Sequence, residues 1–164
     1  MTLLALMILM VLIVLIILLV LIVLAGRPYG GCSILWRRTL WARVETVSCD
    51  SRRVCTIRIS NSQFSLLLIN VYFPHEDDGN SIHEFVLQLA VIEDLINSNP
   101  NCHIVCGGDC NVDFSRNWQH TNIVNEFYDS NNLFPVIKHP CSIINFMYHF
   151  NMSRFKILDH FIVS

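Results

Sequence analysis

Charge is scarce in this chain of 164 residues, of which only 15% are Asp, Glu, Lys or Arg. The formal net charge is -2 at pH 7, so the composition lacks the overall basic excess that favours contact with a polyanion. A local basic cleft can still act under a nearly neutral total. The length is sufficient for one domain with a substantial core, and the chain shows no internal repeat.

Charged residues, glycine and proline are missing altogether from residues 2–25. About 20 apolar residues in a helix cross the hydrocarbon core of a bilayer, so this segment predicts a transmembrane helix. It is longer than the apolar core of a signal peptide, and no basic residue precedes it. Arg27, Arg37, Arg38 and Arg43 follow it, which by the positive-inside rule places the remainder in the cytoplasm. The segment is also of low complexity, so a fortuitous leader on a nuclear or cytoplasmic protein is the alternative interpretation.

A disulfide framework is not indicated either. The chain has 7 cysteines, an odd number, and most of them lie in apolar stretches, which favours buried thiols in a reduced compartment. Cys102, Cys106 and Cys110 are evenly spaced, but zinc sites usually pair such residues with a second closely spaced set. The sequence has no such set, so we do not predict zinc.

Strand-like and helix-like patterns alternate over residues 26–164, which predicts one α/β domain after the hydrophobic segment of residues 1–25. Residues 65–73 are nearly all apolar, as in a central strand buried on both faces, and their polar exceptions Asn70 and Tyr72 share a face. Ser81 and Glu84 fit a capping box that opens a helix. We also predict strands at 32–36, 54–59, 103–107, 146–150 and 155–163 and a second helix at 121–128.

Two polar residues, Asp109 and Asn111, follow the apolar strand that ends at Gly107 and Gly108. Alternate residues of a strand share a face, so we expect Asp109 and Asn111 to project together at its carboxyl end. Ligands of open α/β sheets bind outside such ends, where a carboxylate and an amide can orient a water and contact a phosphate. In the alternative interpretation, Asp109 is a turn residue that bonds its own backbone.

Four motifs occur in order along the chain: Gly26-Arg-Pro-Tyr-Gly-Gly31 with Ile34-Leu-Trp-Arg37, Asn70-Val-Tyr-Phe-Pro74, Gly107-Gly-Asp-Cys-Asn-Val-Asp-Phe114 and Ile157-Leu-Asp-His-Phe-Ile-Val-Ser164. Together they resemble the endonuclease/exonuclease/phosphatase family, which has the DNase I-like fold. Within it they are most similar to the apurinic-type endonuclease domain of non-LTR retrotransposons. The order gives weight to motifs that are individually weak. The resemblance implies an incomplete two-sheet α/β sandwich, preceded here by one long hydrophobic helix.

The resemblance also implies roles for four residues in the hydrolysis of a phosphodiester in DNA. Asp109 would orient or activate the attacking water and contact Mg²⁺ or Mn²⁺, and Asn111 would hold that water and a phosphate oxygen. Tyr72 would contact the phosphate, and Asp159 would orient a catalytic histidine. A divalent cation stabilises charge that develops on oxygen, and Mg²⁺ needs few protein ligands because it keeps several waters. Considered singly, Tyr72 is more often a core residue and Asp159 a cap of a backbone group, whereas the ordered motifs favour the functional roles; we interpret His160 as packing.

The sequence departs from the family at two essential points. The region that would supply the metal-binding glutamate is replaced by residues 2–25, and Glu45 comes too late in the chain to match it. The chain ends at Ser164, before the Ser-Asp-His strand that carries the catalytic histidine. The loss of one member of a catalytic unit costs orders of magnitude in rate, so we expect little hydrolysis. Cys110 stands where the branch often has an aromatic residue, which we regard as tolerable.

Three hypotheses follow from these observations. The first is a retrotransposon-type, metal-dependent DNA endonuclease domain that is impaired. The second is a membrane-tethered phosphoesterase of the same fold, motivated by residues 2–25. The third is a relic or gene-model product in which a chance hydrophobic leader precedes a broken domain.

Overall fold

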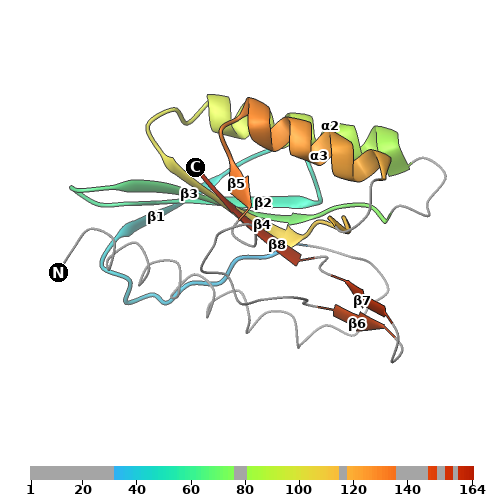
Figure 1. Ribbon diagram of the computed structural model, residues 1–164. Helices are drawn as coiled ribbons and strands as arrows, with labels where there is room; N and C mark the ends of the chain where they lie inside the picture. The colour runs from blue at the N-terminus through green and yellow to red at the C-terminus, as the bar shows by residue number, and fades with distance from the viewer. Residues whose placement is uncertain (1–31, 76–80, 115–117, 136–147, 151–153, 157–158) are drawn as a thin grey trace.

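The computed structural model describes residues 32–75, 81–114, 118–135, 148–150, 154–156 and 159–164. A mixed six-stranded sheet has the strand order β1-β2-β3-β4-β8-β5, and β6 and β7 form a separate two-stranded sheet (Figure 1). The strands are β1 Arg43–Val47, β2 Val54–Ser60, β3 Ser65–Tyr72, β4 His103–Asp109, β5 Phe134–Pro135, β6 Tyr148–Phe150, β7 Arg154–Lys156 and β8 Asp159–Val163. Within the six-stranded sheet, β3 and β4 pair in parallel and the other neighbours are antiparallel.

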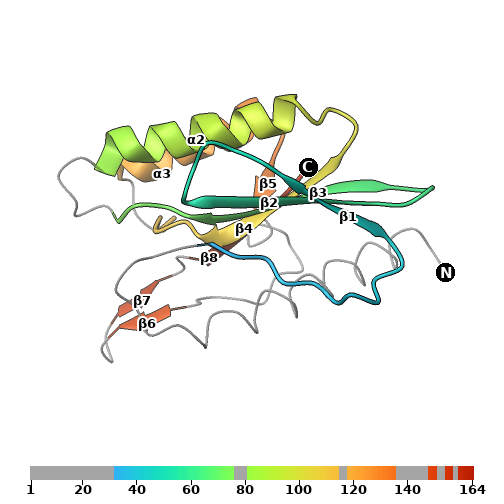
Figure 2. The ribbon, with the colours of Figure 1, turned by 180° about the vertical axis from the view of Figure 1, so that it is seen from behind.

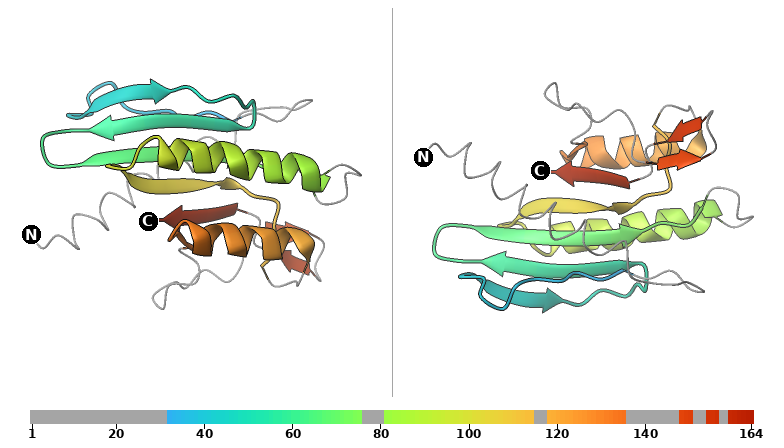
Figure 3. Two further views of the ribbon diagram at one scale, coloured as in Figure 1. Left: turned by 90° about the horizontal axis from the view of Figure 1, so that it is seen from above. Right: turned by 90° about the horizontal axis from the view of Figure 1, so that it is seen from below.

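Two helices cover one face of the large sheet. Helix α2, Ser81–Asn97, connects the parallel strands β3 and β4, and α3, Gln119–Ser130, follows β4 along the chain. Figures 1 and 2 show both helices on the same side of the sheet, with β6 and β7 on the opposite side. The views from above and below in Figure 3 place α2 along β3 and β4 and place α3 beside β8. This arrangement confirms the α/β prediction.

The strand period of two divides the apolar side chains of the sheet between two cores. The larger core lies between the sheet and the helices and includes Leu67 and Ile69 of β3 with Phe85 and Ile92 of α2. The smaller core lies on the other face and includes Leu66, Leu68, Ile57, Ile59 and Ile34. β3 is therefore buried on both faces, as predicted. Its alternation places Asn70 and Tyr72 on the face that points away from the helices.

Most of the predicted elements within the described residues are confirmed. The strand at 32–36 is wrong, because these residues have no strand pairing. Their contacts instead join a side chain to a backbone carbonyl: the Cys32 thiol donates to the Arg53 carbonyl at 3.0 Å, and the Asn70 amide donates to the Ser33 carbonyl at 3.0 Å. The final predicted strand, 155–163, is two strands, β7 and β8, and residues 157–158 lie outside the described part. Strands β1 and β5 were not predicted.

The predicted hydrophobic helix at residues 2–25 lies outside the described residues. Among the helices that are described, none combines the length and the apolar character needed to cross a membrane.

Candidate active site

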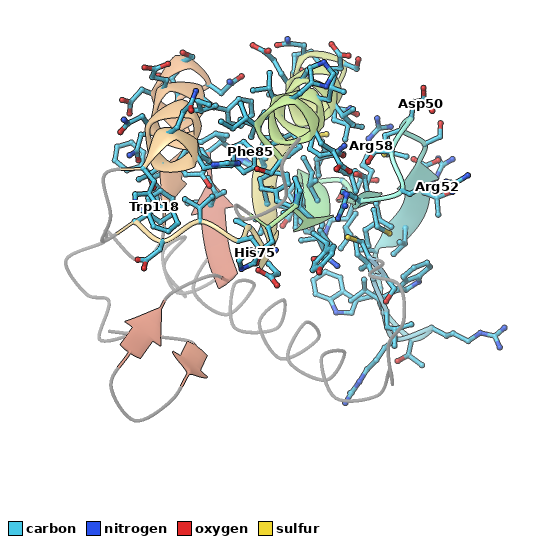
Figure 4. The ribbon with its side chains drawn as sticks, turned by 90° about the vertical axis from the view of Figure 1, so that its right-hand side faces the viewer. Asp50, Arg52, Arg58, His75, Phe85 and Trp118 are labelled. Carbon is cyan, nitrogen blue, oxygen red and sulfur yellow. The ribbon has the colours of Figure 1, made fainter. Side chains whose placement is uncertain are left out.

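Three of the four predicted site residues occupy one row across the sheet. Tyr72 is the register partner of Asp109 across the parallel pair of β3 and β4, and Asp109 is the partner of Asp159 across the antiparallel pair of β4 and β8. Neighbouring strands lie about 4.8 Å apart, so the three backbone positions fall within about 10 Å. The edge where β3 and β4 end faces the viewer in Figure 4.

The row lies where the sheet changes from buried core to accessible edge. Tyr72 and Asp109 are the last residues of β3 and β4, and both side chains are half-buried. Partners in register share a face, so both residues project from the face opposite the helices. Figure 4 shows His75, which follows β3, and Trp118, which precedes α3, at the same end of the molecule. This end is where the sequence motifs predicted a ligand.

Gly108 allows β3 and β4 to approach closely enough for this row. Its φ of +134° lies in a region that residues with a Cβ atom rarely adopt. A Cβ atom at this position would lie 2.1 Å from the Val71 carbonyl oxygen and 2.7 Å from the Asn70 side-chain oxygen. The glycine before Asp109 is thus required by backbone packing, independently of any ligand.

Asn111 corrects one sequence expectation. β4 ends at Asp109, and Asn111 has a φ of 50°, so the alternation of strand side chains does not extend to it. The Asn111 backbone N–H donates to Asp109 Oδ1 at 3.1 Å, and its side-chain Nδ2 donates to the Phe73 carbonyl at 2.7 Å. The side chain is 8% exposed. Asn111 therefore ties together the ends of β3 and β4 and lies beside Asp109 through its backbone.

The bond from the Asn111 N–H to Asp109 Oδ1 is the local contact expected if Asp109 is a turn residue. Asp109 makes this bond and also lies in the row with Tyr72 and Asp159. An acceptor oxygen bound by a backbone N–H fixes the orientation of the carboxylate. A catalytic carboxylate also needs a fixed orientation, so the bond is compatible with both interpretations.

Arg53 is a neighbour of the row that the sequence motifs did not reveal. Its carbonyl accepts the Tyr72 backbone N–H at 2.9 Å, and its guanidinium carbon lies 5.6 Å from the centroid of the Tyr72 ring. The side chain is paired with Glu84 of α2 at 2.6 Å. Only the antiparallel pairing of β2 with β3 brings Arg53 beside Tyr72, and no local pattern encodes that pairing.

The half-buried Cys32 thiol lies near the row, bonded to the Arg53 carbonyl. Burial and, to a smaller extent, the neighbouring Cys55 thiol raise the pKa of Cys32 to about 12, and the Asp109 carboxylate is a lesser contributor in the same direction. Cys32 therefore remains protonated at neutral pH. The Cys32 thiol and the Tyr72 N–H both donate to the Arg53 carbonyl, so Cys32 adjoins the site.

The donor atoms at the site suit a hard cation but are few. The Asp109 carboxylate provides oxygen ligands of the kind that Mg²⁺ binds, whereas the Asn111 side chain is buried and bonds the Phe73 carbonyl. No cluster of three or more His, Cys, Asp or Glu side chains with metal-binding geometry occurs within the described segments. Glu45 lies on β1, separated from β4 by two strands, and it pairs with Arg43 at 2.6 Å and Arg58 at 3.8 Å. Glu45 is therefore not part of the candidate site.

No protein-family model matches the sequence, and no curated protein matches it. The structure is similar to the endonuclease domain of TRAS1, a telomere-specific non-LTR retrotransposon, with a TM-score of 0.58 and 11% identity over 76% of this chain and 55% of that one. It is also similar to the human Nocturnin catalytic domain, with a TM-score of 0.50 and 13% identity over 74% of this chain and 48% of that one. The chain thus spans about half the length of these structures. The described residues have a partial DNase I-like fold.

Proposed function

We propose that this DNase I-like domain is a metal-dependent phosphodiester hydrolase of the retrotransposon endonuclease type, with DNA as its substrate and with impaired activity. The row of Tyr72, Asp109 and Asp159 at the ends of the central strands is the observation that carries the proposal. The likeness to the TRAS1 endonuclease domain supports the choice of DNA.

Each residue has a chemical task in this proposal. The Asp109 carboxylate, held by the Asn111 N–H, orients the water that attacks phosphorus. The Tyr72 hydroxyl donates to a phosphate oxygen. In the row, Asp109 on β4 stands between Tyr72 on β3 and Asp159 on β8. A group oriented by Asp159 would therefore approach the phosphate from the side opposite Tyr72.

Asp109 is the residue that would hold Mg²⁺ or Mn²⁺, and Asn111 would hold the attacking water and a phosphate oxygen. A bound divalent cation supplies stabilisation of the negative charge that develops on the phosphate and leaving oxygens. Because the described residues offer no cluster of three or more metal-binding side chains, we expect weak rather than tight binding.

The impairment follows from chemistry that residues 1–164 do not provide. They contain no counterpart of the family's metal-binding glutamate or of its Ser-Asp-His strand. Members of a catalytic unit act together, so the absence of two of them costs orders of magnitude in rate.

Nicking of supercoiled plasmid by the 164-residue chain tests the proposal. We expect at most slow nicking that requires Mg²⁺ or Mn²⁺, stops with a chelator and falls to background in Asp109→Ala. Thr46→Ala is the matched control, because Thr46 is exposed on the distant strand β1. Nicking that persists in Asp109→Ala or without metal contradicts the assignment, and rapid nicking contradicts the impairment.

The membrane location remains a prediction from residues 2–25 alone. If the segment inserts, the full chain stays in the membrane pellet after alkaline carbonate extraction, and deletion of residues 2–25 releases it. A full chain that is released by carbonate contradicts the predicted anchor.

A further inference from the structure

We propose that Arg53 binds a phosphate group of the substrate beside Tyr72. This inference rests on the proposed function and extends it to a residue outside the motifs. Arg53 directly precedes β2, and its carbonyl accepts the Tyr72 N–H at 2.9 Å. The site row therefore has a fourth position, and it is the one that carries a positive charge.

The guanidinium has hydrogen-bond donors to spare at this position. Nε donates to Glu84 Oε1 at 2.6 Å, and the guanidinium carbon lies 5.6 Å from the centroid of the Tyr72 ring. An arginine side chain carries five N–H donors, of which Nε is one. Among the described residues, none accepts a hydrogen bond from either Nη of Arg53. These donors form the planar fork that fits two oxygens of a phosphate.

The side chain and backbone of Arg53 are held on several sides. Its N–H donates to Ser51 Oγ at 3.0 Å, and that hydroxyl donates to Gln88 Oε1 at 2.5 Å. Its carbonyl also accepts the Cys32 thiol at 3.0 Å. Glu84 and Gln88 both belong to α2, so the helix fixes the fork relative to the sheet edge. A binding group whose rotamer is fixed in advance loses little entropy when the ligand arrives.

An ion pair that merely stabilises α2 is the alternative explanation for Arg53. The Arg53 and Glu84 side chains are 29% and 45% exposed, and pairs this accessible to solvent contribute little to stability. Glu84 lies in the first turn of α2, where the helix dipole already favours a carboxylate. Stabilisation of α2, by the ion pair or by the helix dipole, does not account for the position of the Arg53 guanidinium beside the Tyr72 ring.

Titration of the 164-residue chain with inorganic phosphate tests the proposal without any need for hydrolysis. Binding is followed by NMR through the arginine Nε–Hε signals. In Arg53→Met we expect the dissociation constant to rise at least tenfold, and in Arg53→Lys severalfold, because the charge remains and the fork is lost. Arg52→Met is the matched control: Arg52 is the adjacent residue, it is exposed, and it projects away from the sheet edge (Figure 4), so we expect less than a twofold change.

Glu84→Gln separates phosphate binding from helix stabilisation. Glutamine keeps an acceptor for Arg53 Nε and removes the negative charge, so we expect phosphate affinity to be kept or increased. Equal affinities in Arg53→Met and Arg52→Met overturn the proposal, as does the absence of phosphate binding by the unmodified chain. Equal losses of melting temperature in Arg53→Met and Glu84→Gln with unchanged phosphate affinity assign Arg53 to α2 and also overturn it. Failure of the nicking assay alone bears on the proposed function and leaves this measurement intact.

Discussion

Gly108→Ala perturbs the packing on which the whole site row depends. Alanine at position 108 must either adopt a φ of +134°, which residues with a Cβ atom rarely do, or force β4 to move. In the present backbone, its Cβ atom would lie 2.1 Å from the Val71 carbonyl oxygen. Backbone strain of this kind costs about 1–3 kcal/mol. Forcing an extra methyl group into a packed position costs roughly 1–3 kcal/mol more.

The combined loss of about 2–6 kcal/mol is a large part of the roughly 5–15 kcal/mol that stabilises a typical domain. At about 2–4 °C per kcal/mol for a chain of this size, we expect the melting temperature to fall by roughly 5–20 °C. Thermal unfolding followed by circular dichroism measures the change, with Thr46→Ala as a control that shifts the transition little. A Gly108→Ala protein that melts within about 2 °C of the unmodified chain would refute the close-approach argument. If the unmodified chain shows no cooperative thermal transition, the result favours the hypothesis of a relic or gene-model product.

Three further predictions concern buried groups near or beneath the site. Asn111→Ala removes the 2.7 Å bond to the Phe73 carbonyl and should lower the free energy of unfolding, measured by chemical denaturation, by about 1–3 kcal/mol. Asn111→Gly also removes the bond but tolerates the φ of 50°, so it should lower the free energy of unfolding by less. Equal losses in the two variants contradict this prediction. Burial lowers the pKa of His120 below its ordinary value, so the unfolded chain binds more protons than the folded one. The free energy of unfolding should therefore fall as the pH drops below about 6.5, and the slope should be shallower in His120→Gln. Identical slopes in the two proteins exclude His120 as the cause. Burial raises the pKa of Cys106 to about 12, so this thiol should resist iodoacetamide at pH 8 until the protein is unfolded, and mass spectrometry that finds rapid native labelling would disprove its burial.

The elements that the sequence predicted well are those whose patterns are local. β3 was recognisable because a continuous apolar stretch is typical of a strand buried on both faces, and its residues Leu66–Ile69 are all buried. α2 was recognisable from its capping residues and apolar spacing. β1, with the sequence Arg-Val-Glu-Thr-Val, has charged residues at alternate positions and a half-exposed surface, so it gave no comparable signal.

The candidate site was predictable in composition and not in geometry. The motifs identified Tyr72, Asp109 and Asp159, and only the register of three strands shows that they share a row. Asn111 was placed by an alternation that stops two residues earlier, because β4 ends at Asp109 and the backbone at Asn111 takes a φ of 50°. Arg53 was missed because its neighbour Tyr72 is distant in the chain and is brought close only by strand pairing.

In the proposed function, the row of Tyr72, Asp109 and Asp159 lies at one cation and phosphate site. Paramagnetic Mn²⁺, titrated into the isotope-labelled 164-residue chain, tests it directly, since broadening of amide NMR signals depends steeply on distance from the ion. We predict that the amide signals of these three residues and of Asn111 broaden first and together, and that Asp109→Ala removes the effect. Selective broadening at another surface, or broadening that is unchanged in Asp109→Ala, would contradict the account.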